Sequence, residues 1–224
     1  MAFWRPVEML DDEARRRGLT AFLADGVCSQ VRESLQSGPL LVGYALLLGV
    51  SNGGIGLLAA LGPLTQILQL PTVALIERWR ARKVITWWAA LASRASWAAA
   101  LAVPWILPPS RRIPALFVCL TLAAAFGTVA GAAWTPWMRD FLPEHALARA
   151  FARRMAAATA VSAVLVLAAG YTVDALPRQG VSPLPAYMLV FGVGVLAGLV
   201  GLLFLARIPE PAMGVDCSEM APPF

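Results

Sequence analysis

The chain has 224 residues, of which 59% are hydrophobic and only 14% are charged, and its mean hydropathy is +0.69. A soluble domain normally carries about a quarter charged residues, so the composition excludes an ordinary water-soluble globule and predicts a fold surrounded by lipid. The net charge of +5 does not indicate a nucleic-acid partner, because the positive residues stand in short clusters between apolar stretches, as membrane topology requires.

Six apolar stretches follow one another along the chain, at about 20–47, 52–76, 84–107, 113–137, 154–176 and 186–206. Each is long enough to cross a hydrocarbon core of ~30 Å, which takes about 20 helical residues. Lipid offers the backbone no hydrogen bonds, so all six stretches should be helical. We therefore predict an all-α membrane protein with a six-helix bundle at 20–207, a cytoplasmic segment at 1–19 and a cytoplasmic tail at 208–224.

A five-span division is the alternative, with one span at 40–62, a surface helix at 19–37 and a remainder at 64–76 that is too short to cross. Six spans place most Arg residues on one side of the membrane, whereas five spans leave no bias between the two sides. The positive-inside rule therefore favours six spans, with both termini cytoplasmic. The cluster from Ser51 to Gly54 then forms a tight outer turn and starts the second helix.

Charges at membrane depth are costly and are usually functional. Asp25, Arg32 and Glu33 recur at helical spacing on the first span, in a polar stripe that also includes Ser29, Gln36 and Ser37. The second span has a weaker stripe with Gln66 and Gln69, flanked by Thr65 and Thr72. Such stripes need water or protein partners rather than lipid, so we expect both to face one shared polar cavity.

Arg94 is the fourth intramembrane charge, on the third span, at a depth similar to that of Glu33. These two residues could form a pair, and the pair could either serve function or only hold the bundle together. The glycines of the fourth and sixth spans recur at spacings that predict close helix packing: Gly127, Gly131, Gly194, Gly198 and Gly201.

No catalytic pattern is visible in the sequence. There is no HExxH, no GxSxG, no phosphate-binding loop and no carboxylate-rich metal site, and the three cysteines lack ligand spacing. We therefore expect neither an enzyme nor a metal or other cofactor.

The loop between the second and third spans reads Leu75-Ile76-Glu77-Arg78-Trp79-Arg80-Ala81-Arg82-Lys83. It resembles the cytoplasmic signature of the major facilitator superfamily, except that Glu replaces the usual Asp and Arg80-Ala81 replaces a single Gly. The end of the fourth span, from Trp134 to Pro143, looks like the W-x-x-W-M-x-D-x-x-P segment of a bacterial subgroup. The helix opening from Arg149 to Met155 is partly similar to that subgroup's R-G-R-x-F-x-R-R-M segment.

The resemblance implies a fold of twelve helices in two halves, of which this chain matches the first. Spans one, two, four and five line the pathway in that family, which implies a substrate or proton pathway at Asp25, Arg32, Glu33, Gln66 and Gln69. It also implies a cytoplasmic latch in which Glu77 and Arg82 form a charge network with Asp140, accompanied by Arg78 and Arg153. The alternative is that these residues are solvated charges that only set topology.

The function that follows is a secondary transporter that moves a small solute by alternating access, with Asp25 or Glu33 as candidate proton carriers. Its expected partners are the lipid bilayer, the solute and a second six-helix half or another chain, and no nucleic acid. The alternative is a non-transporting membrane module or truncated fragment that scaffolds or pairs with a partner chain.

Overall fold

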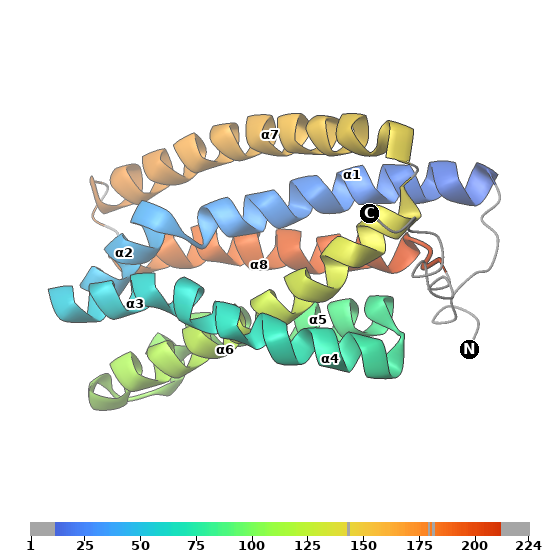
Figure 1. Ribbon diagram of the computed structural model, residues 1–224. Helices are drawn as coiled ribbons and strands as arrows, with labels where there is room; N and C mark the ends of the chain where they lie inside the picture. Colours follow the sequence, from blue (N-terminus) through green and yellow to red (C-terminus); the bar gives the residue numbers. More distant parts are fainter. Residues whose placement is uncertain (1–11, 143, 179, 181, 212–224) are drawn as a thin grey trace.

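The computed structural model describes residues 12–142, 144–178, 180 and 182–211, so parts of the predicted cytoplasmic ends (1–11 and 212–224) lie outside the described residues. The regular structure within these ranges is helical (Figure 1). The helices are α1 (Asp12–Leu35), α2 (Gly38–Leu47), α3 (Asn52–Thr65), the short 3₁₀ helix η2 (Gln66–Leu68), α4 (Gln69–Trp79), α5 (Arg82–Ile106), α6 (Pro109–Phe141), α7 (Glu144–Arg178) and α8 (Pro183–Arg207).

The long helices lie side by side, with connections at two opposite ends of the bundle (Figure 1). One end holds the α4–α5 and α6–α7 connections and the end of α8, and the other holds the α2–α3, α5–α6 and α7–α8 connections. Within the described residues, four segments are long and apolar enough to cross a membrane: Asn52–Trp79, Pro109–Phe141, Ala146–Arg178 and Pro183–Arg207. This all-helical fold is compatible with a multi-pass membrane protein.

The first two expected helices are both interrupted. The first ends at Leu35 and restarts at Gly38, whose φ of +59° precedes Pro39, and the residue before a proline is disfavoured in the helical region. The second contains Pro63, which cannot donate a helical hydrogen bond, and passes through η2 before α4 begins. Ser51 caps α3 as expected, accepting a hydrogen bond from the Gly54 backbone N–H at 3.3 Å.

The helices pack in two groups of three segments. α1 packs against α7 and α8, while α6 packs against α5 and against α3 and α4; contact between α5 and α8 joins the groups. Exchanging the first three segments with the last three (α1 with α6, α3–α4 with α7, α5 with α8) reproduces these contacts. The first three and the last three segments each contain an odd number of helices that alternate in direction, so the second set runs inverted relative to the first. The bundle thus has the neighbour pattern of an inverted repeat.

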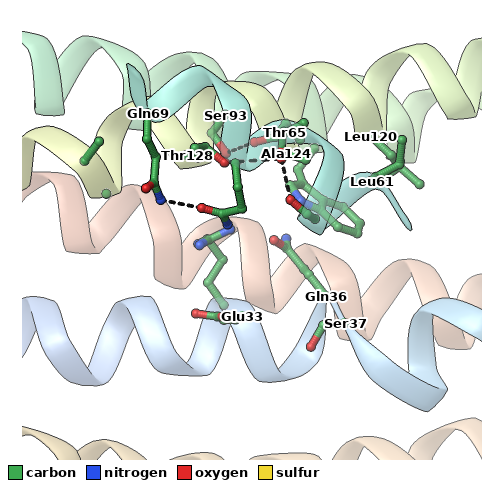
Figure 2. Close-up of a pocket in the computed structure, with 18 of the residues that line it drawn as sticks. Glu33, Gln36, Ser37, Leu61, Thr65, Gln69, Ser93, Leu120, Ala124 and Thr128 are labelled. Carbon is green, nitrogen blue, oxygen red and sulfur yellow. Dashed lines mark hydrogen bonds between the residues drawn. The ribbon is translucent and has the colours of Figure 1, made fainter. Parts of the chain in front are cut away.

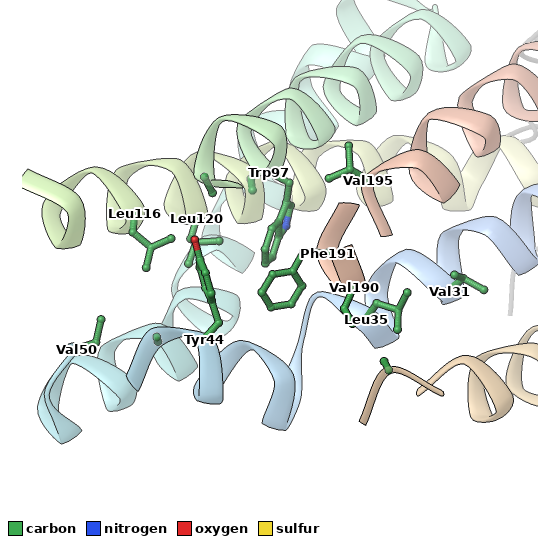
Figure 3. Packing of buried hydrophobic residues seen from close by; sticks show 14 residues of the cluster. Val31, Leu35, Tyr44, Val50, Trp97, Leu116, Leu120, Val190, Phe191 and Val195 are labelled. Carbon is green, nitrogen blue, oxygen red and sulfur yellow. The ribbon is translucent and has the colours of Figure 1, made fainter. Parts of the chain in front are cut away.

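Two apolar cores lie toward opposite ends of the bundle. One contains Tyr44, Trp97 and Phe191, whose rings meet with centroids 5.2 Å (Tyr44 to Phe191) and 5.8 Å (Trp97 to Phe191) apart (Figure 3). The other contains Phe22 and Trp137. On α1, α5, α6 and α8, the residues between the two cores include Asp25, Arg94, Gly127 and Gly198, whereas Arg32 lies beside Val31 of the Trp97 core. A polar layer therefore separates the two cores.

Candidate functional site

A cavity of about 900 Å³ opens at the level of the polar layer, between the end of α1, the interrupted α3–η2–α4 segment, α5 and α6 (Figure 2). We call it the Arg32 cavity. Its polar lining includes Arg32, Glu33, Gln36, Gln66 and Gln69, and its apolar lining includes Leu41, Leu58, Leu61, Trp97 and Leu120. The cavity is therefore polar where the two helix interruptions meet and apolar toward the Trp97 core.

The predicted pathway residues lie together around this space. Arg32, Glu33, Gln66 and Gln69 line the Arg32 cavity, while Asp25 lines an adjoining cavity of about 260 Å³. Both cavities share Arg32 and Glu33 among their lining residues, which makes them neighbours. The structure thus brings the two polar stripes to one space, while their role in transport stays a prediction.

Both helix interruptions face the Arg32 cavity. Gln36 extends from the break after α1, and Gln69 extends toward it from the opposite wall, where it donates a hydrogen bond to Gln66 (Figure 2). Thr65 donates to the Gly62 carbonyl at 2.9 Å, and its hydroxyl also accepts a hydrogen bond from Thr128 of α6 at 3.2 Å. Interrupted helices inside a membrane are tolerated where the freed backbone groups line a cavity or are buried in protein.

Asp25 forms a buried ion pair that the sequence analysis missed. Both terminal nitrogens of Arg154 on α7 lie 3.1 Å from one Asp25 carboxylate oxygen, and Ser29 donates to the other oxygen at 3.3 Å. The Arg154 guanidinium also makes cation–π contacts with the rings of Phe22 and Trp134, with its Cζ 4.7 and 4.8 Å from their centroids. The fifth apolar stretch is expected to begin at residue 154, but α7 begins at Glu144, so Arg154 lies ten residues inside the helix.

Arg94 contacts the backbone of α8 rather than Glu33. Its Nε donates to the Gly198 carbonyl at 2.6 Å, and among the described residues no ion pair joins it to Glu33. A Cβ atom placed on Gly198 would lie 2.8 Å from Arg32 Cδ and 3.2 Å from Arg94 Nε. This glycine of α8 therefore makes room for arginine side chains, as well as letting helices approach.

Arg32 and Gln36 carry buried polar atoms without partners. The Nε of Arg32 and both terminal atoms of the Gln36 amide are buried and form no hydrogen bond with the described residues. Gln36 packs against Gly194, where an added Cβ would lie 3.1 Å from its Cγ. Glu33 is exposed in the isolated chain, at the border of the cavity. Buried polar groups in native structures are normally satisfied, so these atoms identify a place for a ligand or water.

A second polar cluster lies at the end of the bundle where α4 meets α5, and we call it the Arg82 cluster. Arg82 is 2% exposed and pairs with Asp140 at the end of α6. Its backbone N–H donates to Glu210 at 2.7 Å, and its side chain donates to the Pro211 carbonyl at 3.3 Å. The segment after α8 is held further by Trp137, which donates to the Pro209 carbonyl at 3.0 Å.

The Arg82 cluster differs in membership from the predicted latch. The expected pair of Arg82 with Asp140 forms, but Glu210 occupies the place expected for Glu77. Glu77, Arg78 and Arg153 are exposed, and none of them forms an ion pair with the described residues. The sequence signal for Glu210 was the Ile208-Pro209-Glu210-Pro211 segment, whose two prolines fix the chain directly after α8.

Burial changes the acidity of two groups at this end of the bundle. Desolvation raises the pKa of Glu210 above its ordinary value, although the backbone N–H groups of Lys83 and Arg82 and the charges of these residues oppose the shift. Desolvation also lowers the pKa of Lys83 to about 8, against the opposing charge of Glu210.

The described residues contain no group of three or more His, Cys, Asp or Glu side chains that could hold a metal ion. The chain matches no protein-family model, no curated protein and no solved structure. Any functional conclusion therefore rests on the residues and geometry of the chain itself.

Proposed function

We propose that this chain is a six-helix half of a secondary transporter of the major facilitator type, which binds a small solute in the Arg32 cavity. The observation that carries the proposal is the cavity of about 900 Å³ at the meeting point of two interrupted helices. Substrate sites of secondary transporters lie near the bilayer midplane, at repeat interfaces and beside broken helices.

Two further features support a transporter half. The packing repeats between the first and last three segments, and inverted repeats are common in transporter folds. The Arg82–Asp140 pair joins α5 to α6 at the end of the bundle that topology predicts to be cytoplasmic, where the family resemblance implies a latch. In this proposal all six helical segments cross the bilayer, including the charge-bearing α1–α2 and α5, and a second half or another chain completes the pathway.

The proton-carrying role in this proposal is best assigned to Glu33. Asp25 is engaged by Arg154, whereas Glu33 borders the Arg32 cavity and makes no ion pair with the described residues. If transport is driven by protons, Glu33→Gln in the complete transporter should abolish pH-driven uptake while the protein stays folded. Unchanged coupling in that variant would remove Glu33 from this role.

The rival proposal is a membrane module that scaffolds a partner without transporting anything. It is motivated by the apolar side chains around η2, where Leu64, Ile67 and Leu70 are 60%, 70% and 75% exposed. Such a surface fits either lipid or the face of another chain.

The test is solute uptake by proteoliposomes that contain the full chain. The vesicles are incubated with a defined mixture of organic acids, sugars and amino acids, and their contents are identified by mass spectrometry. In these vesicles a second copy of the chain supplies the other half, and we expect uptake of at least one solute above that of empty vesicles. Absence of uptake by correctly inserted protein would contradict transport by this chain alone and favour the scaffold.

A pair of glycine variants makes the uptake test specific to the cavity. Gly131 lines both cavities, and Gly192 lines neither, yet a Cβ atom on either glycine meets no heavy atom within 4 Å. Gly131→Trp should fill the space and abolish uptake, while Gly192→Trp should leave it intact. Equal uptake by the two variants would show that the solute does not pass through this cavity.

A further inference from the structure

The two adjoining cavities carry an excess of positive charge. Their charged lining residues are three arginines, Arg32, Arg94 and Arg154, and two carboxylates, Asp25 and Glu33. Charge that is not neutralised at membrane depth is costly, so the site as a whole favours an anion over a cation.

The three guanidinium groups differ in the hydrogen-bond partners that they already have within the chain. Arg154 is held by Asp25 and by the Phe22 carbonyl, and Arg94 donates to the Gly198 carbonyl. Arg32 forms no hydrogen bond with the described residues, and its buried Nε is without a partner. Arg32 is therefore the arginine whose donors are available to a ligand.

Gln36 supplies a second donor one helical turn from Arg32. Gln36 directly follows the last residue of α1, and its backbone N–H still donates to the Arg32 carbonyl at 3.0 Å. Its side-chain amide nitrogen is also buried without a hydrogen-bond partner among the described residues. A planar guanidinium with an amide beside it matches an oxyanion head group, because carboxylates and phosphates accept several N–H donors at once.

The rest of the cavity is too large and too apolar for an inorganic ion alone. Its volume of about 900 Å³ is that of a site for an organic molecule. Four leucines and Trp97 line the end away from Arg32. We infer that the Arg32 cavity binds an organic anion whose carboxylate or phosphate head group contacts Arg32 and whose apolar body lies against Trp97. This inference rests on the proposed function for its setting, because the anion would be the transported solute.

Equilibrium binding to the full chain in detergent micelles tests this inference without requiring transport. The anionic probes are benzoate, octanoate and phenyl phosphate, and the matched probes are benzamide, octanamide, benzylammonium and inorganic phosphate. We expect at least one organic anion to bind at least tenfold more tightly than its neutral or cationic counterpart and than inorganic phosphate. Comparing benzoate with phenyl phosphate identifies the preferred head group. Equal affinity within the matched sets, or no binding of any organic anion, would overturn the inference.

Two variants should change the affinity in opposite directions. Arg32→Gln should weaken binding of the preferred anion roughly tenfold, as expected for one lost charged hydrogen bond, and Arg32→Lys should restore part of it. Glu33→Gln removes a competing negative charge at the cavity border and should tighten binding. Arg153→Gln removes an exposed arginine outside both cavities and should change nothing. Wild-type affinity in Arg32→Gln, or weaker binding in Glu33→Gln, would contradict the assignment.

The outcomes separate this inference from the proposed function. Anion binding without uptake in the proteoliposome test would keep the anion site and reject transport by the chain alone. Uptake of a neutral or cationic solute that Gly131→Trp blocks would keep the transporter and reject the anion site.

Discussion

The Arg82 cluster and the Arg32 cavity each contain an arginine whose Nε is buried without a hydrogen bond to the described residues, but the two side chains differ in their ion pairs. Arg82 is 2% exposed and has a carboxylate on each side, from Asp140 and Glu210. Arg32 is partly buried and lies near Glu33 and Asp25, but its side chain forms no hydrogen bond or ion pair with the described residues. A buried charge with its partners in the chain belongs to the fold, whereas one without them needs a partner from outside the chain. The following predictions test this contrast.

The largest effect should come from breaking the Arg82 cluster. Arg82→Gln removes one of the two positive charges beside the buried Glu210 carboxylate, leaving Lys83, and it also removes the partner of Asp140, so the free energy of unfolding should fall by about 3 kcal/mol. Reversible unfolding by sodium dodecyl sulfate in mixed micelles, followed by circular dichroism, measures the change. The control is Arg78→Gln in the last turn of α4, where the exposed side chain should contribute less than about 0.5 kcal/mol. A decrease of less than about 1 kcal/mol in the free energy of unfolding for Arg82→Gln would show that the charges of the cluster are solvated.

The next effect tests the room that α8 leaves for the arginines. Gly198→Ala places a methyl group 2.8 Å from Arg32 Cδ and should cost about 1–3 kcal/mol of unfolding free energy through overpacking. Gly192→Ala on the same helix meets open space and should be neutral or slightly stabilising, because alanine favours helix more than glycine does. The same unfolding assay compares the two variants. Equal changes would mean that Gly198 serves no packing role at Arg32.

A smaller effect concerns the pH dependence of the Arg82 end. The pKa of Lys83 is about 8 in the folded chain and 10.5 ordinarily, so the folded state binds fewer protons between these values. The free energy of unfolding should therefore rise with pH from about 8 to 10.5, by roughly 1–2 kcal/mol, and this increment should be lost as pH falls through 8. The measurement is the difference between wild type and Lys83→Met across this range. A difference that does not vary with pH would show that Lys83 is solvated.

The smallest effect on stability should come from Arg32. Arg32→Gln removes a charge that holds no hydrogen bond to the described residues, so the free energy of unfolding should change by less than about 1 kcal/mol. Measured in the same assay as Arg82→Gln, this variant compares the contributions of the two arginines to the free energy of unfolding. A loss greater than 2 kcal/mol would mean that Arg32 supports the fold, and the cavity would lose its main candidate for ligand contact.

Much of the helical architecture could be predicted from hydropathy alone. The six apolar stretches fall within helical segments of the structure, and four of these segments in the described residues are long and apolar enough to cross a membrane. The interruptions at Gln36 and at η2 were not predicted. Pro63 and the Gly38-Pro39 pair were visible in the sequence, but proline is often tolerated within membrane helices, so neither position fixed a break.

The candidate site was predictable in its members but less so in its pairings. Helical periodicity placed Arg32 and Glu33 on one face, and they do line one cavity. The partner of Asp25 depends on where α7 begins and how it rotates against α1, which one sequence does not specify. Similar depths along their helices suggested that Arg94 and Glu33 could form a pair. Depth does not give the direction in which a side chain points, and the Arg94 side chain reaches the Gly198 carbonyl on α8.

The polar layer between the two apolar cores also has a mechanical consequence. The cores around Trp97 and Trp137 are closely packed, whereas the layer between them contains glycines and open volume. Close packing resists deformation, so we expect the two ends of the bundle to be stiffer than the layer between them. Bending in such a bundle would concentrate at the level of Asp25 and Arg94, so either end could tilt while its own core stayed intact.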